Sequence, residues 1–115
     1  MLQCFYPDKY IVSTYQINFD RLYEQGYRGI IFDIDNTLVP HGAPADDRAI
    51  ALFERLRGIG FGYCLLSNNQ IERVAPFADA IQARYIENAH KPSVKNYRKA
   101  MELLGTDTGN TIFIG

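Results

Sequence analysis

Polar side chains that could take part in a reaction stand at or shortly after the ends of three apolar runs of this sequence. Asp33 and Asp35 follow the run "GIIF" and are separated by a single residue. Ser67 and Asn68 follow the run "FGYCLL", and Lys91 comes after the short run "RYIE". Two carboxylates, a hydroxyl, an amide and an ammonium group, each placed where a buried segment ends, make a candidate reaction site.

The two aspartates suit phosphoryl chemistry. Residues i and i+2 of an extended segment point to the same side, so Asp33 and Asp35 can share one polar target. Two carboxylates this close repel each other, and a hard cation such as Mg²⁺ relieves that repulsion. One carboxylate can then attack phosphorus, while the other protonates the leaving oxygen and later activates water. We therefore expect Asp33 and Asp35 to react with a phosphoryl group and to bind its magnesium ion.

The remaining three residues fit the same chemistry, and each also has a simpler interpretation. Ser67, Asn68 and the free N–H groups of a following helix start can hold phosphate oxygens. Lys91 can neutralise negative charge on the nucleophile and the phosphoryl group. Ser67 and Asn68 would equally serve as helix caps, and a lone lysine is usually a solvated surface residue. Only the joint occurrence of these residues favours a site.

Apolar runs that alternate with segments of helical period predict how these residues are positioned. The strands are expected at about 27–32, 61–66, 84–87 and 110–115, and the helices at about 19–25, 47–60, 67–81 and 91–105. Gly58 and Gly60 are expected to end the second helix, and Pro76 to kink or split the third. Strands that alternate with helices indicate βαβ units, and hence a three-layer, doubly wound α/β fold with a parallel sheet. The carboxyl ends of such strands line one crevice, where ligands bind.

Composition narrows the class of protein. The chain has 115 residues, which fits a single domain, and its net charge of -1 comes from 12 basic and 13 acidic residues. This balance gives no indication of the basic surface that binding to nucleic acid requires. Cys4 and Cys64 differ in setting and predict no disulfide, and no apolar stretch resembles a signal peptide or a membrane span. These features predict a cytoplasmic protein.

Three motifs carry a family resemblance. "DIDNTLV" resembles the first motif of the haloacid dehalogenase (HAD) superfamily, and "LLSNN" and "HKP" resemble its second and third motifs in the right order. With the N-terminal "FYPDKYI", the chain is similar to the subclass IIIA, YqeG-type phosphatases, relatives of the phosphatidylglycerophosphate phosphatases. The resemblance covers about residues 29–115. It implies a HAD-like Rossmannoid core and a magnesium-dependent phosphatase. The family's cap domain is expected to be missing, because only a short loop follows Thr37 and only one helix and one strand separate Ser67 from Lys91.

The resemblance also assigns roles to the residues. Asp33 would be the nucleophile that forms an aspartyl phosphate, and Asp35 would be the acid/base. Both would bind Mg²⁺, while Ser67 and Asn68 would bind phosphate and Lys91 would stabilise charge. The open crevice implied by the missing cap suits a large or membrane-borne phosphomonoester, such as phosphatidylglycerophosphate, better than an enclosed small metabolite.

One departure from the family pattern concerns the C-terminal end. The fourth motif should follow the fourth strand with a further acidic metal ligand, but the sequence ends at Gly115. We therefore expect a truncated chain, with an N-terminal extension at 1–28 and an incomplete core at 29–115, whose own phosphatase activity is weak or absent. The last strand would leave an edge open, which favours a homo-oligomer, and contact with a membrane surface is a further expectation.

Two rival interpretations belong to other classes of protein. A receiver-like phosphoacceptor signalling module has a similar length, fold and metal requirement, but it needs an acceptor aspartate at the end of its third strand. No acidic residue ends "FGYCLL" here. The second rival is a non-catalytic scaffold that kept the HAD fold and lost its fourth motif. Phosphatase turnover by a longer version of the chain would separate this second rival from an enzyme.

Overall fold

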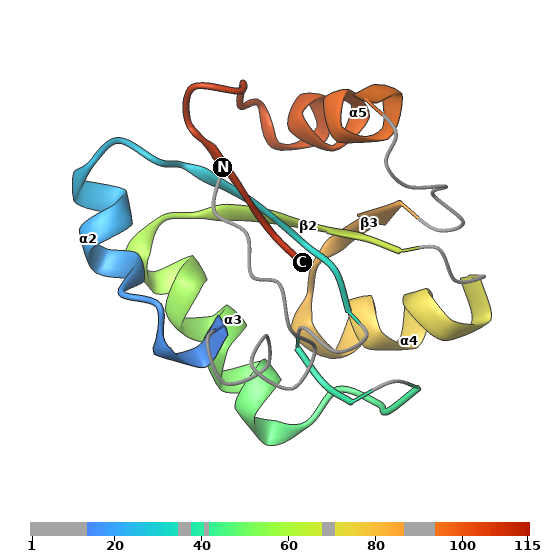
Figure 1. Ribbon diagram of the computed structural model, residues 1–115. Coiled ribbons are helices and arrows are strands. Elements are labelled where there is room, and N and C mark those ends of the chain that lie inside the picture. Colours follow the sequence, from blue (N-terminus) through green and yellow to red (C-terminus); the bar gives the residue numbers. More distant parts are fainter. Residues whose placement is uncertain (1–13, 35–37, 41, 68–70, 87–93) are drawn as a thin grey trace.

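The computed structural model of the chain describes residues 14–34, 38–40, 42–67, 71–86 and 94–115. They form a four-stranded, all-parallel sheet with the strand order β3-β2-β1-β4. Helices cover both faces of the sheet, with α5 on one side and α2, α3 and α4 on the other (Figure 1). The three-layer α/β fold expected from the sequence is confirmed, and the described residues include no cap domain.

Each predicted element lies within the segment where the sequence placed it. The strands are β1 (Gly29–Phe32), β2 (Gly62–Leu66), β3 (Arg84–Ile86) and β4 (Thr111–Ile114), and the helices are α2 (Phe19–Glu24), α3 (Asp47–Ile59), α4 (Ile71–Ile81) and α5 (Val94–Leu104). A helical turn at residues 14–16 was not predicted. Among the described helices, none is long and apolar enough to cross a membrane.

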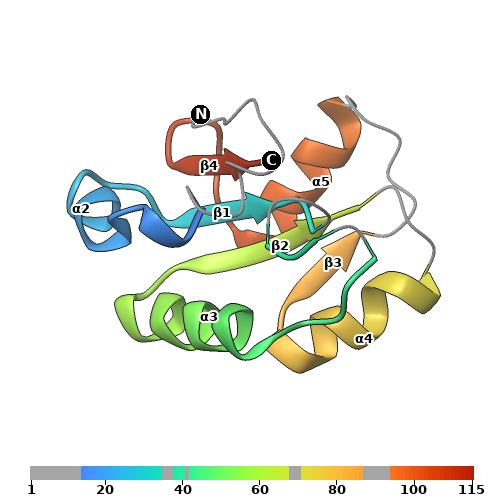
Figure 2. The same cartoon turned by 60° about the horizontal axis from the view of Figure 1, so that its bottom comes forward.

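Alternating side chains of the strands divide the core into two parts. Ile30 and Phe32 of β1 belong to the larger cluster under α2, α3 and α4, whereas Ile31 belongs to the smaller cluster under α5. Figure 2 shows α3 and α4 running along the same face of the sheet. All four residues of β1 are buried, as expected for a central strand of a parallel sheet that is covered on both sides.

The second helix, α3, begins and ends at recognisable caps. The Asp46 carboxylate accepts a hydrogen bond from the Ala49 N–H at 2.8 Å, and Gly60 follows the helix with φ at 120°. Gly58, expected to help end the helix, instead lies inside it, so that prediction was wrong. A helical glycine costs only about 1 kcal/mol, which the buried apolar face of α3 offsets.

Pro76 was expected to kink or split α4, and the split is wrong, because the helix is continuous from Ile71 to Ile81. Proline cannot donate the helical hydrogen bond to the carbonyl four residues earlier, which here is that of Glu72. Both Pro76 and Glu72 are exposed, so water can hydrogen-bond to that carbonyl instead. An exposed position therefore tolerates a proline that a buried helix would not.

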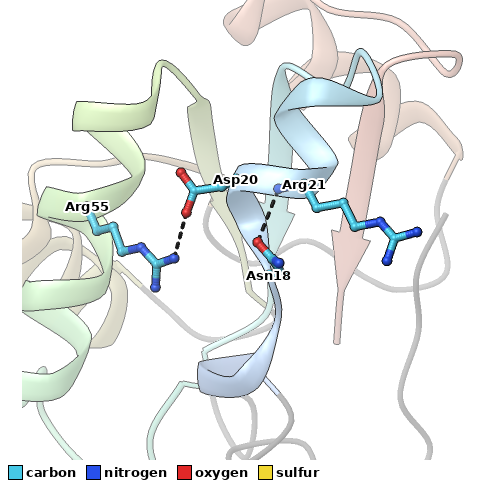
Figure 3. A network of polar contacts seen from close by, with 4 residues as sticks. All are labelled: Asn18, Asp20, Arg21 and Arg55. Carbon is cyan, nitrogen blue, oxygen red and sulfur yellow. Dashed lines mark hydrogen bonds and ion pairs between the residues drawn. The ribbon is translucent and has the colours of Figure 1, made fainter.

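The short helix α2 is fixed to α3 mainly by packing. Phe19 is fully buried in the larger cluster. Figure 3 shows the polar contacts nearby, where the Asn18 side chain accepts from the Arg21 N–H at 3.1 Å and Arg55 forms an ion pair with Asp20 at 2.8 Å. The side chains of that pair are 52% and 60% exposed, so it contributes at most about 1 kcal/mol. Burial of Phe19 contributes more to stability than the ion pair does, at roughly 1.5–3 kcal/mol.

Gly29, the first residue of β1, lies close to the side chain of Thr106, and a substitution tests how tightly they pack. A Cβ atom there would lie 2.8 Å from Thr106 Oγ1, which is itself hydrogen-bonded to Thr111 Oγ1 at 2.9 Å. Gly29→Ala should therefore lower the free energy of unfolding by about 1–3 kcal/mol, measured by urea denaturation. Gly58→Ala is the matched control, because no atom lies within 4 Å of its added Cβ and alanine favours a helix. Equal effects of the two substitutions would contradict the packing described here.

Candidate functional site

The strand order creates a switch point at the carboxyl ends of β1 and β4. The chain passes from β1 to β2 and β3 on one side and then returns to place β4 on the other side of β1. In open α/β sheets, ligands bind outside the carboxyl ends of the strands at such a point. Asp33 immediately follows β1, so the first predicted site residue stands where the topology favours a ligand.

The backbone of Asp33 is fixed against the end of β4. Its N–H donates a hydrogen bond to the Ile114 carbonyl at 3.0 Å. Phe32 pairs with Ile114 in the β1–β4 register, so Asp33 comes beside Gly115. A Cβ atom at Gly115 would lie 3.0 Å from the Asp33 Cβ. The half-buried Asp33 carboxylate also accepts from the Ile34 N–H at 2.9 Å, so both backbone and side chain are held.

Ser67 stands at the end of the neighbouring strand. Phe32 pairs with Leu65 in the β1–β2 register, and continuing that register places Ser67 beside Ile34, one position beyond Asp33. Ser67 is 1% exposed, and its N–H donates to the Ile86 carbonyl at 3.1 Å. The structure thus brings the strand ends that carry Asp33 and Ser67 together at one edge of the sheet.

Asp35, Asn68 and Lys91 lie outside the described residues. The connection that contains Lys91 runs from the carboxyl end of β3 to the amino end of α5. The connection that contains Asn68 runs in the same way from β2 to α4. Their roles at the site remain predictions from the sequence.

The segment after the aspartates returns to the core and is anchored there. Leu38 and Val39 are fully buried in the larger cluster. The Leu38 N–H donates to the Ile34 carbonyl at 3.0 Å, and the Tyr15 hydroxyl donates to the Leu38 carbonyl at 2.9 Å. The Arg48 guanidinium lies 4.2 Å from the centre of the Tyr15 ring. These contacts fix Leu38 and Val39 against the core.

Tyr15 packs against the larger cluster. Burial raises the pKa of Tyr15 to about 12; the Asp46 carboxylate acts in the same direction, and Arg48 opposes them. The hydroxyl therefore stays protonated and can donate to Leu38 throughout the neutral range.

Tyr97 of α5 contacts the strand that ends beside Asp33, a contact that the sequence did not predict. Tyr97 packs edge-on against Phe113 of β4, with ring centroids 5.0 Å apart and an interplanar angle of 81°. Burial raises the pKa of Tyr97, and the negative charge of Asp33 raises it further. In the sequence, helical spacing marks Tyr97 only as part of an apolar face.

A pocket of about 260 Å³ lies between residues 42–45 and the exposed side of α4. Prolines, alanines and Phe77 form much of its lining, together with Glu72 and Arg73. Neither Asp33 nor Ser67 lines this pocket. The residues at the strand ends thus lie outside it, and it provides no enclosed chamber around them.

The donor set at Asp33 is compatible with a hard cation. Carboxylate oxygens are the ligands that Mg²⁺ prefers. Within residues 14–34, 38–40, 42–67, 71–86 and 94–115, no three histidine, cysteine, aspartate or glutamate side chains gather around a common point. Because Asp35 falls outside these ranges, the predicted pair of metal ligands remains a prediction.

Comparison with known proteins identifies a relative. The sequence is 32% identical over 112 residues to the "Probable phosphatase YqeG" of Bacillus subtilis (strain 168). The matched segment is 96% of this chain and 65% of that protein, so the chain spans just under two thirds of the relative's length. No family model matches the sequence, and no solved structure matches it.

The Tyr15 hydroxyl gives a prediction about stability and pH. Tyr15→Phe should lower the free energy of unfolding by about 0.5–1.5 kcal/mol at neutral pH, because the Leu38 carbonyl loses its donor. Tyr15 has a folded-state pKa of about 12 against an ordinary 10.0, so its contribution is complete below pH 10 and is lost as the pH rises toward 12. The difference between wild type and variant should therefore shrink over that interval.

Denaturation with urea at several pH values measures this difference. Tyr27→Phe is a matched control, since Tyr27 is also a half-buried tyrosine at the edge of the larger cluster. A difference for Tyr15→Phe that stays constant up to pH 12 would show that ionisation of its hydroxyl is not linked to folding.

Proposed function

We propose that this protein is a HAD-superfamily phosphatase of the YqeG type, which hydrolyses a phosphomonoester with Asp33 as nucleophile. The position of Asp33 carries the proposal, because it follows the central strand at the switch point between β1 and β4. Ser67 ends the adjacent strand one position further on. The identity of 32% to a protein named as a probable phosphatase supports the same activity.

The reaction proceeds in two steps in this proposal. The Asp33 carboxylate attacks phosphorus, the bond to the leaving oxygen breaks, and Asp35 donates a proton to that oxygen. Asp35 then takes a proton from a water molecule, which attacks the phosphorus of the aspartyl phosphate. This second attack releases inorganic phosphate and restores the Asp33 carboxylate.

The other predicted residues bind and neutralise the phosphoryl group. Ser67 and Asn68 hold its oxygens beside the amino end of α4, where free N–H groups favour an anion. Lys91 offsets negative charge between phosphate and nucleophile. Asp33 and Asp35 would hold Mg²⁺, whose positive charge reduces the repulsion between the attacking carboxylate and the phosphate.

The absence of a cap domain from the described residues supports a large substrate. A lipid phosphate such as phosphatidylglycerophosphate fits this class, because its headgroup could reach an open sheet edge while its chains stay in a membrane. In this proposal the enzyme is cytoplasmic, and its substrate is at a membrane surface or free in solution. Nucleic acid is not a proposed partner, since the net charge is -1.

Asp33→Asn should reduce turnover of p-nitrophenyl phosphate with Mg²⁺ by at least about a thousandfold in the full-length protein, because an amide does not attack phosphorus. The urea midpoint should change little, since the substitution is nearly isosteric. Asp79→Asn on the exposed side of α4 is the matched control and should retain wild-type turnover. Activity of Asp33→Asn within about tenfold of wild type would remove Asp33 from the nucleophile's role.

Asp35→Asn should slow turnover for a different reason. The second step loses its base, so the aspartyl phosphate should accumulate and be recovered after acid quenching of a reaction with labelled substrate. The Asp33→Asn protein, treated in the same way, should yield no labelled protein. If neither wild type nor Asp35→Asn ever carries the label, hydrolysis does not pass through a covalent intermediate.

A further inference from the structure

Asp33 faces the side of the sheet that α5 covers. Ile31, two positions earlier in β1, belongs to the smaller cluster under α5, and side chains alternate along a strand. The effect of the Asp33 charge on Tyr97 of α5 agrees with this direction. The candidate nucleophile and the aromatic residue on α5 therefore share one side of the sheet.

The end of β4 lies between these two residues. A Cβ atom placed on Gly115 would lie 2.8 Å from Phe113 Cζ and 3.0 Å from the Asp33 Cβ. The Phe113 ring and Asp33 therefore both lie close to the backbone of Gly115. The hydrogen bond from the Asp33 N–H to the Ile114 carbonyl, at 3.0 Å, ties the two segments further. A shift of the Phe113 ring would consequently reach Asp33.

Tyr97 supports the Phe113 ring through an aromatic contact. Its edge-to-face contact, with 5.0 Å between the centroids, joins α5 to β4. Phe113 is 6% exposed, and Tyr97 packs against the same small cluster. Because interiors are densely packed, removal of the Tyr97 ring would leave Phe113 room to move.

We propose that Tyr97 is a positioning residue for Asp33, which acts through Phe113 to hold the end of β4 against the aspartate and so fixes the direction of its carboxylate. The kinetic consequence rests on the proposed phosphatase function. A displacement of about 1 Å in a reacting group is enough to cost a large factor in rate. The ring of Tyr97, and not its hydroxyl, provides this support.

Steady-state kinetics of full-length variants with p-nitrophenyl phosphate test the proposal. Tyr97→Leu should lower kcat by about tenfold or more while KM stays within about twofold, and Tyr97→Phe should keep kcat within about twofold of wild type. Tyr85→Leu is the matched control, because Tyr85 is a half-buried tyrosine of β3 that packs against the larger cluster on the other face. It should lower the urea midpoint to a similar extent and leave kcat unchanged.

Hydrogen exchange of the Asp33 amide provides a readout that needs no activity. Tyr97→Leu should speed this exchange by about tenfold or more, and Tyr97→Phe and Tyr85→Leu should not. The Gly62 amide, which donates to the Arg28 carbonyl at 2.9 Å at the opposite end of the sheet, serves as the internal reference. If wild type itself hydrolyses nothing, the proposed function fails, while the exchange rates still decide whether Tyr97 holds Asp33.

Three results would overturn the proposal. The first is exchange of the Asp33 amide that is unaffected in Tyr97→Leu. The second is an active wild type whose kcat survives Tyr97→Leu. The third is a Tyr97→Phe protein as impaired as Tyr97→Leu, since the hydroxyl would then act in place of the ring.

Discussion

The two-sided pairing of β1 is the constraint on which the rest of the structure depends. Its four residues are hydrogen-bonded to β2 on one edge and to β4 on the other, and they are buried on both faces. Such a strand cannot slip by one residue without exposing its apolar side chains and burying others of the wrong kind. The end of β1 is therefore fixed in space, and with it the position of Asp33.

The surroundings of Asp33 add restraints at the end of β4. The Asp33 N–H donates to the Ile114 carbonyl, and Gly115 lies beside the Asp33 Cβ. The carboxylate stays half-buried among them. Preorganisation of this kind, in which neighbours hold a reacting group in place before substrate arrives, is what efficient group transfer requires.

Much of this arrangement was predictable from the sequence because it depends on local patterns. Apolar runs and the helical periodicity of the segments between them predicted β1–β4 and α2–α5 to within a few residues, and the rule that parallel strands end at one edge placed Asp33 and Ser67 together. The expectations that failed involve exposure, which a single sequence does not reveal. Gly58 and Pro76 sit on exposed helix surfaces, where they are tolerated. The contact of Tyr97 with Phe113 and the proximity of Gly115 to Asp33 depend on strand order, which no local pattern encodes.

The strand order also has a consequence for how the chain folds. β1 and β2 are joined through a single helix and can pair early. The pairing of β1 with β4 joins Gly29 to Thr111, which lies 82 residues later in the chain. Closing that long loop is slow, because its entropic cost comes before any contact compensates for it. During synthesis, the β4 side of Asp33 is therefore completed after β1, β2 and β3 have been made, and until then one edge of β1 is an unpaired strand that favours aggregation.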